Sequence, residues 1–225
     1  MIDGILNINK PAGMTSHDVV QCIRRLINQK KVGHAGTLDP QAEGVLILLL
    51  GKATKLSESL KSDSKEYLAE MKLGIKTTTQ DAWGQIIEQK SNFTIQKKDI
   101  EKVLLDFEGE INQIPPMFSA IHHEGKRLYE LARLGKEVER QPRKVKIFEI
   151  KLLNFIHQDE FRFKVTCSSG TYIRTLCADI GEALGVGGHL TSLKRIKSGN
   201  FKIEDSIGLK DLIEGKIKVE EVLLS

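Results

Sequence analysis

Gly33-His34-Ala35-Gly36-Thr37-Leu38-Asp39-Pro40 is the stretch that decides the fold, because it stands just before the most apolar run of the chain, Val45–Leu50. Gly33 and Gly36 allow backbone conformations closed to other residues, and Pro40 keeps Asp39 out of the helical region. We therefore expect a turn that holds Asp39 rigidly beside a buried strand. Asp-Pro is also an ordinary turn dipeptide and His34 an ordinary loop histidine, so this stretch alone does not establish an active site.

The bulk composition fits a self-sufficient globular protein. A chain of 225 residues with 40% hydrophobic content can bury a sizeable core as one domain with two lobes or as two small domains. Cys22, Cys167 and Cys177 form no Cys-x-x-Cys pair and leave one cysteine over in any disulfide scheme, which suits a reducing compartment. The first residues do not resemble a signal peptide, and no apolar run is long enough to span a membrane. We expect a soluble cytoplasmic protein without membrane contact.

The periodicity outside this stretch mixes strands and helices. Residues 5–10 alternate like a strand, and the spacing from Thr15 to Asp18 is that of a capping box that opens a helix. Further helices are expected over 52–60, 100–107, 128–134 and 173–184, and further strands around 45–50, 67–73, 145–147 and 161–167. No regular βαβ rhythm links them. The sequence therefore predicts an α+β fold with a mixed, mostly antiparallel sheet.

Positive charge is concentrated in two segments. Residues 126–146 hold eight Lys or Arg against three Glu, and four basic residues stand between Glu182 and Glu204 with no acid among them. Unbalanced positive charge attracts polyanions, which is typical of a surface that binds nucleic acid. A solvated helix face is the alternative for either segment taken alone.

The candidate chemistry is that of a carboxylate. The six histidines and three cysteines show no metal-ligand spacing, and no phosphate-binding glycine loop or Gly-x-Ser-x-Gly elbow is present. Arg174 follows a predicted strand and a glycine turn, where its planar guanidinium could clamp Asp39. A purely structural ion pair is the alternative. Tyr67 is either a core aromatic or a ring at a cleft edge that stacks on a base. Lys10 either belongs to a simple strand-to-helix turn or approaches a substrate or phosphate.

These segments together resemble the TruB family of tRNA pseudouridine-55 synthases over nearly the whole chain. The resemblance rests on motifs that agree in order and spacing. They are KPAGMTS at 10–16, KVGHAGTLDPQAEGVL at 31–46, GKATK at 51–55, KEY at 65–67, GIKTTTQDAWG at 74–84, IPPMFSAIHHEGKRLYELAR at 114–133, CSSGTYIRTLCADIGEALG at 167–185 and LTSLKR at 190–195.

The resemblance implies an isomerase that converts a uridine in the T loop of tRNA to pseudouridine. The nucleotide would be flipped out of the loop, its glycosidic bond cleaved, the base rotated, and the bond rejoined through C5, without a cofactor or metal. It also implies the pseudouridine-synthase fold, a bent mixed sheet flanked by helices, with two lobes around one central cleft over residues 1–225. The family commonly carries a C-terminal PUA module, and none is expected here in full.

Site residues carry over from the resemblance position by position. Asp39 matches the essential aspartate, whose role as nucleophile at the sugar or in proton transfer stays open. Arg174 matches the arginine that pairs with it, Tyr67 the tyrosine against the target base, Tyr172 and Leu193 the pocket lining, and Lys10 a supporting lysine. His34 matches the histidine that enters the T loop.

The basic segments then become an RNA surface for the T-arm stem-loop. From charge alone we expect Lys126, Arg127, Arg133, Arg143, Lys194 and Arg195 to contact phosphates. A monomer is expected. Two alternatives stay open, a tRNA-folding chaperone that acts independently of catalysis and a base-excising enzyme that would release free uracil.

Overall fold

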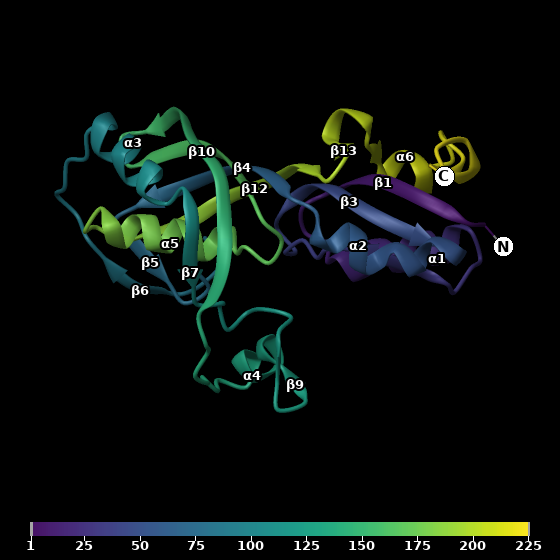
Figure 1. Ribbon diagram of the computed structural model, residues 1–225, viewed down its shortest axis with the longest axis horizontal. Helices are drawn as coiled ribbons and strands as arrows, with labels where there is room; N and C mark the ends of the chain where they lie inside the picture. The colour runs from purple at the N-terminus through teal and green to yellow at the C-terminus, as the bar shows by residue number, and fades with distance from the viewer. Residues whose placement is uncertain (1, 225) are drawn as a thin grey trace. The chain divides into compact units, whose positions relative to one another are not determined.

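The computed structural model describes residues 2–224 (Figure 1). The chain forms two compact units. The first unit contains the residues up to 68 together with those from 192 on, and the second contains residues 69–191. Strands β4 (Lys65–Leu73) and β12 (Gly188–Ser198) contribute residues to both units.

The first unit is built around β3 (Glu43–Leu50). Strand β1 (Gly4–Lys10) pairs with β3 in antiparallel register, from Gly4 opposite Leu50 to Lys10 opposite Gly44. Along the opposite edge, β2 (Val32–Ala35) pairs antiparallel with the end of β3, and β12 pairs parallel with its start. All side chains of residues 45–50 are fully buried, which confirms the predicted strand with two covered faces.

Short helices and strands complete the first unit. Helix α1 (Ser16–Leu26) begins after Thr15, whose side chain forms the predicted capping box with Asp18. The single helix expected over residues 52–60 is instead a 3₁₀ turn, Gly51–Leu56, followed by α2 (Ser57–Ser62). The Thr54 hydroxyl donates to the carbonyl of Gly51 at 2.8 Å, a local bond that favours the tighter turn. The later elements are β13 (Phe201–Lys202), a 3₁₀ turn (Ile203–Asp205), β14 (Ile207–Gly208), α6 (Leu209–Ile213) and a 3₁₀ turn (Val219–Glu221).

The second unit contains the strand order β4-β11-β10-β7. The long strand β10 (Arg143–His157) pairs antiparallel with β11 (Glu160–Cys167) and with β7 (Gly109–Gln113). Two small antiparallel pairs lie outside this order, β5 (Ile75–Thr77) with β6 (Ile86–Gln89) and β8 (His122–His123) with β9 (Lys126–Arg127). The alternate side chains of β11 are buried as predicted. The α+β class with a mixed, mostly antiparallel sheet is confirmed.

Three helices belong to the second unit. Helix α3 (Lys97–Asp106) and helix α5 (Ile173–Ala183) bury the apolar faces that their periodicity predicts. The short α4 (Leu128–Arg133) lies with β8 and β9 in the segment between β7 and β10, and Figure 1 shows this segment extending away from those strands. In the part of the chain that the structure describes, no helix combines the length and apolar character that crossing a membrane requires.

Candidate active site

Asp39 lies at the end of a short segment whose backbone is held from several sides. Ser16, the first residue of α1, is buried, and its hydroxyl accepts from the Leu38 N–H at 2.9 Å and donates to the Leu38 carbonyl at 3.2 Å. The Asp39 carbonyl accepts from the Ala42 N–H at 3.1 Å. The half-buried Asp39 is therefore fixed through the main chain on both sides, as the sequence predicts for this turn.

Lys10 holds the other end of this segment. Its side chain is fully buried, and Nζ donates to the carbonyls of Pro11 at 2.8 Å, Met14 at 2.6 Å and Pro40 at 3.0 Å. All three N–H groups of the ammonium are used, so the alternative that Lys10 approaches a phosphate is wrong. Burial lowers the pKa of Lys10 to about 8, although the nearby Asp39 carboxylate favours the charged form.

Arg195 corrects an expectation from the charge pattern. It was predicted to contact RNA phosphates, but its side chain is only 1% exposed. Nε donates to the carbonyl of Val45 at 2.7 Å, Nη2 to that of Gly36 at 3.2 Å and Nη1 to that of Thr37 at 3.4 Å. A guanidinium enclosed by main-chain carbonyls cannot lie on an RNA-binding surface. Its neighbour Lys194 is half-buried.

His34 lies in a strand rather than in the expected loop. Strand β2 places it opposite Leu48 of β3, and the short, glycine-containing strand gave no periodic signal of its own. Burial, followed by the positive charge of Arg195, lowers the pKa of the His34 imidazole below its usual value. A half-buried ring that is neutral at pH 7 is suited to stacking on bases and gives no charge for binding phosphate.

The remaining predicted residues of the first unit lie on β4 and β12. Tyr67 is 8% exposed and alternates along β4 with other buried side chains, so most of its ring is part of the protein interior. Leu193 is half-buried on β12. Asp39, Lys10, His34, Tyr67 and Leu193 therefore all belong to the first unit.

Arg174 and Tyr172 belong to the second unit, at the start of α5. The Arg174 side chain is 4% exposed, and its guanidinium donates to the carbonyls of Thr79 at 3.1 Å and Phe118 at 2.9 Å. The Asp81 carboxylate lies 3.8 Å from Arg174 Nε. Arg174 thus holds together two loops and an acid of its own unit. Its pairing with Asp39 joins residues of different units and stays a prediction.

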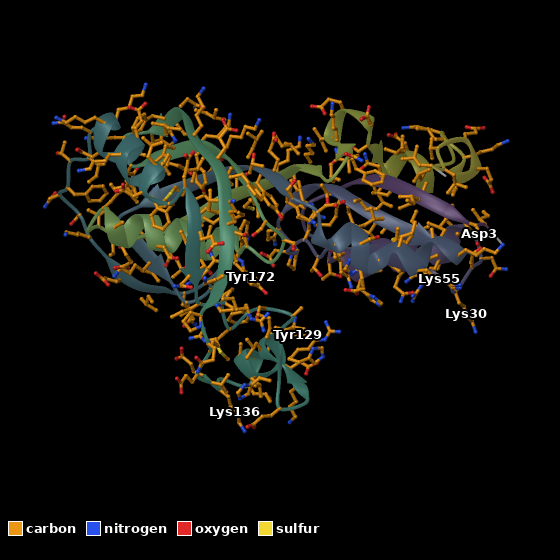
Figure 2. All side chains as sticks on the ribbon, viewed as in Figure 1. Asp3, Lys30, Lys55, Tyr129, Lys136 and Tyr172 are labelled. Carbon is orange, nitrogen blue, oxygen red and sulfur yellow. The ribbon has the colours of Figure 1, made fainter. Side chains whose placement is uncertain are left out.

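The backbone at Tyr172, which is labelled in Figure 2, is fixed by a side chain that the sequence analysis missed. The Gln113 amide accepts from the Tyr172 N–H at 2.7 Å and donates to the Tyr172 carbonyl at 3.1 Å. Gln113 is 2% exposed at the end of β7. A buried glutamine that closes such a pair ties β7 to the start of α5. Nothing in the local pattern distinguishes it, nor Ser16 or Asp81, from ordinary polar residues.

The basic segment of the second unit is exposed as predicted. Lys126 and Arg127 lie on β9, and among the described residues neither side chain forms an ion pair. On α4, the Arg133 guanidinium lies 5.4 Å from the centre of the Tyr129 ring, a cation–π contact. Figure 2 shows Tyr129 and Lys136 on this protruding segment. Arg143 is exposed at the start of β10. These side chains are free to meet phosphates.

The chain is similar to known proteins over nearly its whole length. A family model described as "TruB family pseudouridylate synthase (N terminal domain)" matches residues 24–173. This chain belongs to the TruB family. A second model, "tRNA pseudouridylate synthase B C-terminal domain", matches residues 174–224. The resemblance drawn from the motifs is confirmed.

Relatives of this TruB-family chain match almost all of it. A protein of Syntrophomonas wolfei named "tRNA pseudouridine synthase B" is 50% identical over 225 residues, 98% of this chain and 75% of the relative. One of the same name from Clostridium kluyveri is 52% identical over 211 residues, 94% of this chain and 72% of the relative.

Two solved structures have folds similar to that of this chain. A chain in "Crystal Structure of a Cbf5-Nop10-Gar1 Complex" is 37% identical with a TM-score of 0.73, and the match covers 94% of this chain and 54% of that one. A second, in "Structure of H/ACA RNP bound to a substrate RNA containing 2'-deoxyuridine", is 33% identical with a TM-score of 0.72 and covers 97% and 57%. The TruB-family chain thus spans just over half of the length of these solved chains. The family and structural matches confirm the expected fold class.

Proposed function

We propose that this protein is a tRNA pseudouridine synthase that isomerises the uridine at position 55, in the T loop, with Asp39 as its catalytic residue. The family and the names of the relatives support pseudouridine formation in tRNA. The assignment of Asp39 rests on how its segment is held. Main-chain carbonyls on both sides of the acid accept hydrogen bonds from buried side chains. Such preorganisation is what catalysis by a fixed carboxylate requires.

The proposed reaction is an isomerisation that needs no oxidant or reductant. The bond from sugar C1′ to base N1 breaks, the base rotates within the pocket, and a bond from C1′ to C5 forms. The hydrogen on C5 leaves to solvent, and N1 gains a proton. Asp39 either attacks C1′ to form a covalent intermediate or acts in the proton transfers. Both roles require its carboxylate to be held close to the sugar.

The uridine has to leave the stacked T loop before this chemistry can start. Unstacking costs a few kcal/mol, which contacts with bases and phosphates must supply. The neutral ring of His34 and the exposed part of Tyr67 are the proposed contacts with bases. Lys126, Arg127, Arg133 and other exposed basic side chains are the proposed contacts with phosphates. Arg195 is not among the proposed phosphate contacts because its side chain is buried.

The decisive experiment measures tritium release from RNA labelled at uridine C5, on both the isolated T arm and full-length tRNA. Wild-type protein should release tritium, and Asp39→Asn should not, while binding RNA as well as wild type. Asp106→Asn is a matched control because Asp106 is exposed at the end of α3. If Asp39→Asn releases tritium at the wild-type rate, Asp39 is not the catalytic residue.

Other outcomes distinguish the alternatives. RNA binding and refolding of the T arm without tritium release, unchanged in Asp39→Asn, would favour a folding chaperone. Free uracil among the products would favour base excision. We further propose that the protein is a cytoplasmic monomer that binds the T arm of tRNA. Light scattering of the protein alone and with tRNA measures the oligomeric state.

A further inference from the structure

Arg195 is anchored where β12 meets the start of β3. Its backbone pairs with Gly44 in parallel register, and a Cβ added at Gly44 would lie only 2.2 Å from the Arg195 carbonyl oxygen. Gly44 also has a φ of +102°, which favours glycine. The two backbones therefore approach more closely than any other residue at position 44 would allow. The base of the Arg195 side chain is fixed by this contact.

The guanidinium of Arg195 is buried without an acid. Within residues 2–224 it forms no ion pair, and its hydrogen bonds go to the three carbonyls of Val45, Gly36 and Thr37. Burying a charge without a counter-charge is costly, so hydrogen bonds to several carbonyl dipoles have to offset that cost. If this buried position needed only to be packed, an apolar side chain would fill it without the cost of burying a charge. The arginine at this position therefore calls for an explanation beyond packing.

The three acceptors show what the guanidinium connects. Val45 lies in the central strand β3, whose side chains from Val45 to Leu50 are fully buried, whereas Gly36 and Thr37 belong to the segment that leads to Asp39. The planar fork of arginine can reach acceptors in several fixed directions at once, which the single ammonium of lysine cannot. Arg195 thus ties the approach to Asp39 directly to the buried central strand of the unit.

We propose that Arg195 is a positioning residue for Asp39. It fixes the carbonyls of Gly36 and Thr37, Ser16 fixes Leu38, and Lys10 fixes Pro40, so that the backbone on both sides of the acid is set. Among the described residues Arg195 forms no ion pair with the acid, and its burial keeps it away from the RNA. The inference rests on the proposed function, in which Asp39 reacts at the sugar. A loosened segment would misplace the carboxylate without changing the RNA-binding surface.

The test compares Arg195→Lys with Arg24→Lys. Arg24 is the matched control because its Nη2 also donates to a main-chain carbonyl at 2.7 Å, that of Val32, the first residue of β2, which lies outside the bonded stretch from Gly36 to Pro40. We expect Arg195→Lys to lower the single-turnover rate of tritium release about 10²-fold, the usual effect of a misplacement near 1 Å. Its Kd for tRNA should stay within about twofold of wild type, and Arg24→Lys should keep both values.

Two further measurements separate positioning from folding. Arg195→Ala should regain part of its rate when free guanidinium ion is added below denaturing concentrations, and Arg24→Ala should show no such response. The Leu38 N–H donates to the Ser16 hydroxyl and the Ala42 N–H to the Asp39 carbonyl. Amide hydrogen exchange at these two residues should be about tenfold faster in Arg195→Lys than in wild type. This exchange is measured without substrate.

The outcomes keep the two proposals apart. If wild-type protein releases no tritium but Arg195→Lys still accelerates exchange at Leu38 and Ala42, the proposed function fails and the positioning role stands. If wild type is active and the folded Arg195→Lys variant keeps the wild-type rate, the positioning role is refuted. A loss of rate that matches the unfolded fraction, or an equal loss of tRNA affinity, would refute it as well.

Discussion

Replacing Lys10 by methionine should change how the stability of the protein depends on pH. In the folded protein the pKa of Lys10 is about 8, lowered from 10.5 mainly by burial. In the unfolded chain the side chain is solvated and returns to its ordinary value. Between these two values the unfolded state binds more protons than the folded state, so the free energy of unfolding rises with pH. Methionine has no proton to exchange and removes this contribution.

The magnitude follows from the two pKa values. The whole difference between about 8 and 10.5 corresponds to about 3.4 kcal/mol. From about pH 7 to about pH 9.5, the contribution of Lys10 rises by about 2 kcal/mol, because the folded state loses its proton over most of this range and the unfolded state does not. Below about pH 7 both states are protonated, and no further change is expected from this group.

Urea unfolding of wild type and Lys10→Met at both pH values measures this effect. All other titrating groups are common to the two proteins, so the change with pH in their stability difference isolates Lys10. Wild type should gain about 2 kcal/mol relative to the variant on going to the higher pH. A difference that stays constant within experimental error, or falls with pH, would refute the assignment of a buried, destabilised ammonium. The same deprotonation leaves two N–H groups for three carbonyls, so tritium release should also slow above about pH 8.

Three further predictions concern other parts of the protein. Asp81→Asn removes the carboxylate 3.8 Å from Arg174 Nε, and we expect the rate of tritium release to fall about tenfold at unchanged tRNA affinity, measured by single-turnover kinetics. Lys126→Ala should weaken tRNA binding and lower the slope of log K against log salt by about 1, whereas an unchanged slope would remove Lys126 from the phosphate contacts. Gly44→Ala should cost about 3 kcal/mol or prevent folding in thermal melts, because its Cβ would collide with the facing carbonyl of β12, while Gly33→Ala, with open space around the new Cβ, should not.

Local sequence determined the elements whose pattern is complete within a few residues. Tyr67, Ala69, Met71 and Leu73 alternate along β4 and are all buried, as their spacing predicts. The capping box at Thr15 sets the start of α1 in the same way. In such segments the signal lies in neighbouring residues, because helix and strand periods place every second or every third to fourth side chain on one face.

The motifs also allowed Asp39 and Arg174 to be selected from the sequence, and the family match agrees with the resemblance from which they were taken. What the motifs did not reveal is how the acid is held. Ser16 looked like a residue of a helix start, yet its hydroxyl is shared with Leu38, 22 residues further on. A hydroxyl side chain suits a helix start and a distant bond equally well, and local pattern cannot separate the two uses.

The charge pattern failed most clearly at Arg195. A run of basic residues predicts an exposed surface, because ions are best solvated by water. The tertiary structure instead encloses this guanidinium with carbonyls of residues that lie 150 or more positions away along the chain. Strand β2 was missed for the same reason, since the four residues Val32–Ala35 carry no strand pattern of their own and form a strand because the edge of β3 offers partners. The sequence by itself determined the family and the elements with a clear helix or strand period, and it selected Asp39 as the candidate catalytic residue. The tertiary structure alone decided which charges are buried around the segment of Asp39, because burial depends on contacts between distant segments.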